Sequence, residues 1–135
     1  MMVKLKDKIL VVCSGNINRS PVAEYLFRKL GFTNVDSCGL GKSAAKGLPM
    51  AKKMRMTFDI DYSHKSKSIT KELVDWSDIV FCMGPGQVRK VNKIYNTDKA
   101  IMLGGVKIDD PHFTNNHQEV KDQIENIIKE YKNPT

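Results

Sequence analysis

The sequence has no long hydrophobic run. The apolar run near its start, Ile9 to Val12, is far shorter than the roughly 20 residues of a membrane helix. It is also shorter than the apolar segment of a secretory signal. These absences predict a protein that does not span a membrane and that resides in the cytoplasm.

Cysteine is scarce. Cys13, Cys38 and Cys82 form no C-x-x-C pair and have no zinc-type spacing to histidine. An odd number of cysteines also argues against the disulfide framework of a secreted protein. We therefore expect three free thiols, and the spacing predicts no metal site.

The composition is otherwise that of a globular protein. A chain of 135 residues with 41% hydrophobic and 27% charged residues predicts one domain, residues 1–135, and excludes disordered and collagen-like chains. The net charge of +7 favours anionic partners, such as an acidic protein or a phosphorylated substrate. Aromatic residues do not interleave with the lysines, so we do not expect nucleic-acid binding. The sequence does not indicate an oligomeric state.

Apolar runs and helical periodicities alternate along the chain. We predict strands at residues 8–12, 35–38, 79–83 and 100–103 and helices at 20–30, 49–56, 86–95 and 116–131, a further helix from Ser68 or Thr70 to Trp76, and a loop at 39–47. Ser20 is expected to cap the first helix with Pro21 at its first position, and Leu48, Met50 and Met54 are expected to face inward. Strands separated by helices predict an α/β fold, a three-layer sandwich with a four-stranded parallel sheet between helices.

The loop after the first strand has the spacing C-x5-R, from Cys13 to Arg19. Backbone N–H groups in such a loop and the N-terminus of the following helix attract an anion, and the planar guanidinium of Arg19 can bracket two phosphate oxygens. The same field favours the thiolate of Cys13, which is the nucleophilic form of cysteine. Ser20 could donate a hydrogen bond to the sulfur. We therefore predict a phosphate-binding loop with Cys13 as its nucleophile.

Asp110 is the candidate proton donor for the leaving oxygen of a phosphate ester. It lies in Asp109-Asp110-Pro111-His112-Phe113, which follows the last predicted strand and so falls at the same edge of the sheet as the cysteine loop. An acidic pair before proline is also common in simple turns. The C-x5-R loop favours the catalytic interpretation.

These residues resemble the low-molecular-weight protein tyrosine phosphatases. The signature loop and first helix of that family are similar to Val11-Val12-Cys13-Ser14-Gly15-Asn16-Ile17 and Arg19-Ser20-Pro21-Val22-Ala23-Glu24, and the family's general-acid motif resembles Asp110-Pro111. Weaker similarities occur at Val35-Asp36-Ser37, Ser63-His64, Ile69-Thr70-Lys71-Glu72 and Cys82-Met83. The resemblance covers nearly the whole chain.

The resemblance implies phosphomonoester hydrolysis through a phosphocysteine, with phosphotyrosine proteins or small aryl phosphates as substrates. It implies catalytic roles for Cys13, Arg19 and Asp110, and binding of phosphate and oxyanion analogues without a metal or cofactor. The phosphate-binding residues that it implies are Ser14, Gly15, Asn16, Ile17, Asn18, Arg19 and Ser20. It also implies that Asn16, Ser37 and His64 support the loop and that His112 and Phe113 wall the pocket.

The chain departs from the family pattern at several positions. Asn18 stands where many members have a second cysteine that protects the nucleophile, and Gly84-Pro85-Gly86-Gln87 replaces an acidic and amide-bearing stretch. No aromatic residue lies between Phe32 and Phe58, where members have a pocket wall.

Three other functions stay open. Phosphoarginine phosphatases have a similar loop, with Thr where Ile17 stands. A thiol-coupled arsenate reductase on the same fold needs a relay of further cysteines, for which only Cys82 is available. A phosphocysteine carrier domain, which belongs to a different class, lacks the loop arginine.

Overall fold

A computed structural model describes residues 3–58 and 62–132 of the chain. Its centre is a parallel sheet of four strands in the order β2-β1-β3-β4. The first strand pairs with both β2 and β3, so that Val12 lies opposite Cys38 on one side and Cys82 on the other. The strands are β1 (Ile9–Cys13), β2 (Val35–Gly39), β3 (Ile79–Cys82) and β4 (Ala100–Met102).

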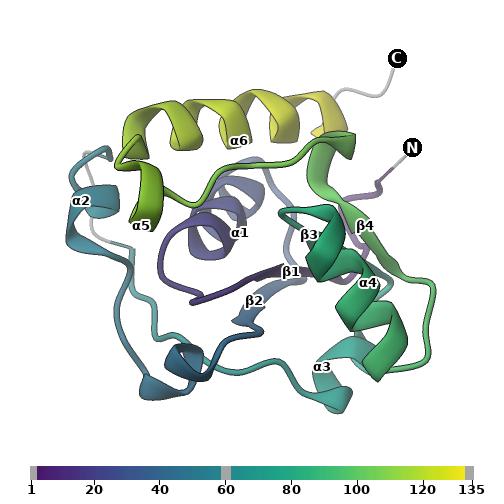
Figure 1. Ribbon diagram of the computed structural model, residues 1–135. Coiled ribbons are helices and arrows are strands. Elements are labelled where there is room, and N and C mark those ends of the chain that lie inside the picture. The colour runs from purple at the N-terminus through teal and green to yellow at the C-terminus, as the bar shows by residue number, and fades with distance from the viewer. Residues whose placement is uncertain (1–2, 59–61, 133–135) are drawn as a thin grey trace.

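Helices cover both faces of the sheet (Figure 1). One face is covered by α1 (Arg19–Lys29) and α6 (His117–Lys132), which pack against each other. The other face is covered by α3 (Lys71–Trp76) and α4 (Pro85–Ile94). The predicted three-layer α/β sandwich is therefore confirmed. The connecting segments contain short helices: η1 (Lys42–Lys46), α2 (Lys52–Arg55), η2 (Leu103–Gly105) and α5 (Pro111–Thr114).

The alternation of side chains along β1 joins the two cores. Ile9, Val11 and Cys13 face the core beneath α1 and α6, whereas Leu10 and Val12 face the core beneath α3 and α4. All five are at most 2% exposed. Full burial of a side chain such as Leu10 contributes about 2 kcal/mol to folding. A strand buried on both faces holds the start of the cysteine loop in a fixed position.

The predicted elements differ from the structure around residues 39–56. The predicted helix at 49–56 is limited to α2, and the predicted loop at 39–47 contains the single turn η1. The helix starts only at Lys52 because Ala51 before it has a non-helical ψ of 137° and donates its N–H to the carbonyl of Ile17. The preceding residues are also held in a loop contact, since Leu48 N–H donates to Ser66 Oγ. Leu48 is 40% exposed, so the expectation that it faces inward was wrong, whereas Met50 and Met54 are buried as predicted.

The start of the first helix also differs from the prediction. The helix begins at Arg19 with Asn18 at its N-cap position, and Ser20 lies inside the first turn. Ser20 is therefore not the N-cap, and its hydroxyl is used elsewhere. The short helix α5 was not predicted, and it begins at Pro111 with the side chain of Asp110 accepting from His112 N–H.

Candidate active site

Cys13 is the last residue of β1, and α1 begins six residues later at Arg19. The intervening loop is at the carboxyl end of the sheet and leads into the N-terminus of α1 (Figure 1). The first N–H groups of a helix have no partner within the helix and carry partial positive charge. One loop residue, Asn16, has a φ of 57°, in the left-handed region. Asparagine tolerates this conformation better than most residues, which explains its use at a sharp turn.

The sulfur of Cys13 receives two polar contacts. Asn16 N–H donates to Sγ at 3.3 Å, and Ser20 Oγ lies 2.9 Å from the same sulfur. Cys13 is 2% exposed and Ser20 is fully buried. Both contacts favour negative charge on the sulfur when the serine hydroxyl is the donor.

Asn16 determines the direction of the serine hydroxyl. Its Oδ1 accepts from the backbone N–H of Lys67 at 3.0 Å, which fixes which end of the amide carries the hydrogens. Nδ2 then donates to Ser20 Oγ at 2.8 Å and to Ser37 Oγ at 3.0 Å. Because Ser20 Oγ accepts this hydrogen bond, its own hydrogen is available to Cys13 Sγ. The network therefore directs a donor at the sulfur.

A buried carboxylate ends the network. Ser37 Oγ donates to Glu24 Oε1 at 2.7 Å, and Tyr62 donates its hydroxyl hydrogen to Glu24 Oε2. Burial, and then the bond to Glu24, raise the pKa of Tyr62, which keeps it a donor. His64 Nε2 lies 2.6 Å from the carbonyl oxygen of Asn16. Asn16, Ser37 and His64, which the resemblance grouped as loop support, are thus brought together.

The segment after β2 holds the outer side of the loop. Leu40 N–H donates to the carbonyl of Cys13 and Gly41 N–H to the carbonyl of Ser14. A Cβ on Gly39 would lie 2.6 Å from both the Ser14 carbonyl oxygen and Ala44 Cβ. Only glycine allows this close approach, so the loop and β2 are packed backbone to backbone.

Gln87 at the start of α4 contacts the loop and was not identified from the sequence. Its Oε1 accepts from Met83 N–H at 2.9 Å, and its Nε2 donates to Ser14 Oγ at 3.2 Å. The amide therefore links the end of β3 to the cysteine loop. The signal for this contact was its place after a predicted strand, where loops of a parallel sheet converge.

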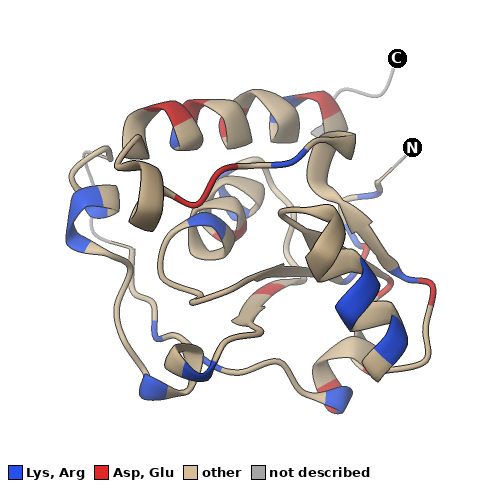
Figure 2. Ribbon diagram, in the orientation of Figure 1, with Lys and Arg blue, Asp and Glu red and all other residues tan. Residues whose placement is uncertain are grey.

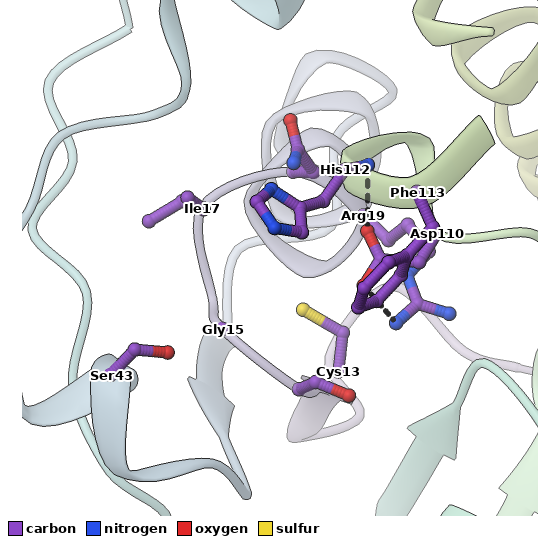
Figure 3. Close-up of a pocket in the computed structure, with 10 residues that line it drawn as sticks. Cys13, Gly15, Ile17, Arg19, Ser43, Asp110, His112 and Phe113 are labelled. Atoms are coloured by element: carbon purple, nitrogen blue, oxygen red, sulfur yellow. Dashed lines mark hydrogen bonds and ion pairs between the residues drawn. The ribbon is translucent and has the colours of Figure 1, made fainter. Parts of the chain in front are cut away.

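Arg19 and Asp110 meet on the other side of the loop. Arg19 Nη1 donates to the carbonyl of Ile108 at 2.9 Å, and Nη2 lies 3.4 Å from Asp110 Oδ2 (Figure 3). The other carboxylate oxygen of Asp110 accepts from His112 N–H at 3.0 Å. Pro111 and the cap of α5 fix the direction of the carboxyl group. Residues 91 positions apart are thus placed beside one cavity.

These residues surround one cavity of about 340 Å³. Figure 3 shows the Cys13 sulfur directed into the space between Ile17 on one side and Asp110 and His112 on the other. The cavity is lined by Cys13, Ser14, Gly15, Ile17, Asn18, Arg19, Ser43, Asp110, His112 and Phe113. Asn16 and Ser20, which were expected to bind phosphate, do not line it, and their side chains contact the loop from behind.

The two side walls of the cavity differ in chemistry: one is aromatic and the other is not. On one side His112 and Phe113 pack edge to face, with ring centroids 4.9 Å apart, and Phe113 is 82% exposed. On the side of η1 the wall is Ser43, which no motif in the sequence signalled. A flat apolar group would therefore rest on one aromatic wall rather than between two.

The other two cysteines are on the opposite face of the sheet. Cys38 and Cys82 pack in the core beneath α3 and α4, whereas Cys13 belongs to the core beneath α1 and α6. Burial, and then negative charge on Cys13, raise the pKa of Cys82 to about 12 and also raise the pKa of Cys38. Both remain neutral thiols at physiological pH. All three cysteines are free and buried.

Two features are absent from the described residues. Across residues 3–58 and 62–132, no three His, Cys, Asp or Glu side chains gather as a metal site would require. In the same part of the chain, no helix combines the length and the apolar character needed to cross a bilayer.

The cavity at the end of the parallel sheet brings together a thiol, an arginine and a carboxyl group. The chain is therefore an α/β protein whose candidate active site is formed around the loop between its first strand and first helix. Residues 8–133 match the family model described as low molecular weight phosphotyrosine protein phosphatase. The chain is 37% identical over 112 residues to a probable low molecular weight protein-tyrosine-phosphatase, EpsP, of Ralstonia solanacearum, covering 77% of each chain. It belongs to the low molecular weight protein tyrosine phosphatase family.

Solved structures agree with this assignment. The structure of Vibrio vulnificus Wzb in complex with benzylphosphonate is 25% identical, with a TM-score of 0.85 over 96% of this chain and 99% of that one. The YwlE arginine phosphatase of Geobacillus stearothermophilus is 26% identical, with a TM-score of 0.83 over 93% of this chain and 90% of that one. One of these structures is thus named an arginine phosphatase, whereas the Ralstonia relative is named a probable protein-tyrosine-phosphatase.

Proposed function

We propose that this chain, acting as a single domain over residues 1–135, hydrolyses phosphomonoesters through a phosphocysteine on Cys13. The observation that carries the proposal is the pair of contacts on Cys13 Sγ, from Asn16 N–H and Ser20 Oγ, inside a cavity that also holds Arg19 and Asp110. Two donors on one sulfur favour the thiolate, and a thiolate beside an anion site is placed to attack phosphorus.

In the first step the Cys13 thiolate attacks phosphorus and the bond from phosphorus to the ester oxygen breaks. The carboxyl proton of Asp110 passes to the leaving oxygen, so an alcohol or phenol departs and a phosphocysteine remains. Arg19 and the N–H groups of the loop stabilise the oxygens of the transferring phosphoryl group.

In the second step water attacks the phosphocysteine. The Asp110 carboxylate takes a proton from that water, the bond between sulfur and phosphorus breaks, and phosphate leaves with the thiolate regenerated. Arg19 Nη2, which contacts Asp110, is one of the donors that a bidentate grip on phosphate uses. A bound phosphoryl group therefore competes with Asp110 for Arg19 and releases the carboxyl group to serve the reacting oxygens.

Phosphotyrosine or another aryl phosphate is the substrate that we propose. Ile17 and the rings of His112 and Phe113 provide apolar contact for a phenyl group at the mouth of the cavity. The relative in complex with benzylphosphonate binds a ligand of this chemistry. Phosphoarginine is the second candidate, because relatives include an arginine phosphatase, and parallel assays with the two phosphorylated amino acids separate them.

Arsenate reduction receives less support. A relay of thiols requires a second cysteine that can reach the first, and Cys38 and Cys82 lie in the core on the opposite face of the sheet from Cys13. The carrier function is disfavoured by Arg19, which lines the cavity beside the sulfur.

The test is hydrolysis of para-nitrophenyl phosphate in the presence of EDTA by the wild type, Cys13→Ser and Cys38→Ala. The proposal predicts turnover by the wild type, none by Cys13→Ser, and near-normal turnover by Cys38→Ala, the matched control on the other face of the sheet. Inhibition of the wild type by vanadate is also expected. Equal activity of the wild type and Cys13→Ser would overturn the proposal.

A further inference from the structure

Basic residues gather on one side of the cavity. From Ser37 to Lys71 the sequence contains eight lysines and arginines, and its only carboxylates are Asp59 and Asp61, which lie outside the described residues. Figure 2 shows this charge on α2 and at η1, whereas the acidic segment that leads into α5 lies across from them. The charge around the cavity is therefore asymmetric.

From this asymmetry we propose a docking surface for acidic residues that flank the phosphorylated residue of a protein substrate. We call it the basic margin and define it by Lys42, Lys46, Lys52 and Lys65. The inference rests on the proposed function and names the kind of phosphoprotein segment that the same site takes: one rich in Asp and Glu.

The basic margin is attached directly to the catalytic loop. Ser43, which lines the cavity, lies in η1 between Lys42 and Lys46. The residue before Lys52, Ala51, donates its N–H to the carbonyl of Ile17 in the cysteine loop. A peptide whose phosphoryl group is at Cys13 and whose chain leaves the cavity over η1 therefore passes next to these lysines.

Lys65 joins the same surface through paired loop segments. Leu48 N–H donates to Ser66 Oγ, and Ser66 N–H donates to the Leu48 carbonyl at 2.7 Å. These two bonds hold residues 46–48 beside residues 64–66. Lys46 and Lys65 are therefore on adjacent segments, and both are exposed.

The margin lysines are free to bind a partner. Lys67 pairs with Asp36, and Lys53 donates to Asn115, but among the described residues Lys42, Lys46, Lys52 and Lys65 have neither an ion pair nor a side-chain hydrogen bond. Folding therefore does not use these four charges in the part of the chain that is described. Lysines beside a charged site raise the association rate of anionic partners and favour them over neutral ones.

A peptide fits this surface better than a nucleic acid does. Proteins that bind single strands stack bases on aromatic side chains, and neither η1 nor α2 contains an aromatic residue. The adjoining cavity of about 340 Å³ has the size for one phosphorylated side chain. The basic side of the cavity, at η1 and α2, therefore offers charge without aromatic rings for stacking, which suits a short acidic peptide.

The experiment compares two phosphotyrosine peptides of equal length, one flanked by Asp and Glu and the other by Asn and Gln. For the wild type at low salt we expect kcat/KM to be roughly tenfold higher for the acidic peptide, and the preference to shrink at high salt. K42E/K46E should abolish or reverse the preference while leaving kcat/KM for para-nitrophenyl phosphate unchanged. K90E/K93E on the exposed side of α4 makes the same change of charge away from the cavity and should retain the preference.

Binding of the same peptides to the Cys13→Ser protein, measured by fluorescence anisotropy, gives a readout that needs no turnover. A tighter Kd for the acidic peptide that K42E/K46E removes would support the docking surface. Equal Kd values for the two peptides, or an equal loss caused by K90E/K93E, would overturn it. So would inhibition by an oligonucleotide equal to that by an unphosphorylated acidic peptide of the same charge. Loss of para-nitrophenyl phosphate hydrolysis, in contrast, concerns the proposed function and not the margin.

Discussion

The hydroxyl of Ser20 accepts from Asn16 Nδ2 at 2.8 Å and lies 2.9 Å from Cys13 Sγ. Its direction is fixed by Lys67 N–H, which holds the other end of the Asn16 amide. The buried hydrogen bonds therefore orient the Ser20 hydroxyl so that its hydrogen points to the sulfur. Hydrogen bonds to a charged group contribute about 1.5–3 kcal/mol, so this contact can stabilise negative charge on the sulfur.

Replacing Ser20 with Ala removes that donor and keeps the volume of the first helical turn nearly unchanged. We expect inactivation by iodoacetate at neutral pH to slow by roughly tenfold, because the sulfur loses a hydrogen-bond donor that stabilises its negative charge. Pro21→Ala, at the neighbouring position of the helix, is the control and should react at the wild-type rate. An unchanged alkylation rate in Ser20→Ala would show that the hydroxyl does not act on the sulfur.

Asp110→Asn removes the proposed proton donor while keeping the shape of the side chain. We expect the rate of phosphocysteine formation to fall by about 10²–10⁴ for esters with poor leaving groups and by much less for good ones. The measurement is kcat/KM for a series of aryl phosphates with leaving groups of increasing pKa. A uniform decrease across the series would exclude Asp110 as the acid.

At the scale of elements, what could be predicted depended on burial. Strands β1, β3 and β4 are short apolar runs, and all four strands were located within about one residue. The apolar signal is continuous in β1, which is buried on both faces, whereas β2 contains Asp36 and Ser37. Residues 49–51 were wrongly included in the predicted helix 49–56, because the contact that holds Ala51, its N–H bond to the Ile17 carbonyl, is tertiary and leaves no trace in the local sequence. Ser43 and Gln87 were missed for the same reason. Ser43 and Gln87 reach the site through contacts between loops that are far apart in the sequence. The C-x5-R motif lies within seven consecutive residues and could therefore be recognised from the sequence.

Replacing Gly39 with Ala tests whether β2 and the cysteine loop must pack this closely. In Gly39→Ala a Cβ would lie 2.6 Å from the Ser14 carbonyl oxygen, so we expect a loss of about 1–3 kcal/mol in the free energy of unfolding and a lower kcat. Gly86→Ala is the control, because a Cβ there is 3.9 Å from its nearest neighbour, the flexible end of Arg89. Urea unfolding measures the free energy of unfolding of each variant, and hydrolysis of para-nitrophenyl phosphate measures its kcat. Equal stability of the two variants would contradict the close packing.

The core beneath α3 and α4 makes the stability of the whole molecule depend on pH. Cys38 and Cys82 are fully buried beneath α3 and α4, and burial raises the pKa of Cys82 from 9.0 to about 12. The pKa of Cys38 rises for the same cause. Since both groups keep their protons longer in the folded state, the stability that they provide is complete below pH 9 and is lost as pH rises toward the folded pKa.

We therefore expect the free energy of unfolding to fall by about 1 kcal/mol for each buried thiol between pH 8 and pH 10. Urea unfolding at the two pH values measures the decrease in the wild type and in Cys38→Ala/Cys82→Ala. The double variant should be less stable at pH 8 but should show a smaller decrease. The same decrease in both proteins would assign the alkaline sensitivity to other groups.

The central claim is that Cys13 carries the phosphoryl group during turnover. The most direct test is to quench the wild type in acid within milliseconds of mixing with para-nitrophenyl phosphate and to locate the phosphoryl group by mass spectrometry. The account predicts phosphorylation of Cys13 in the wild type and none in Cys13→Ser. Steady hydrolysis with no phosphoryl group on Cys13, or with one on another residue, would contradict it.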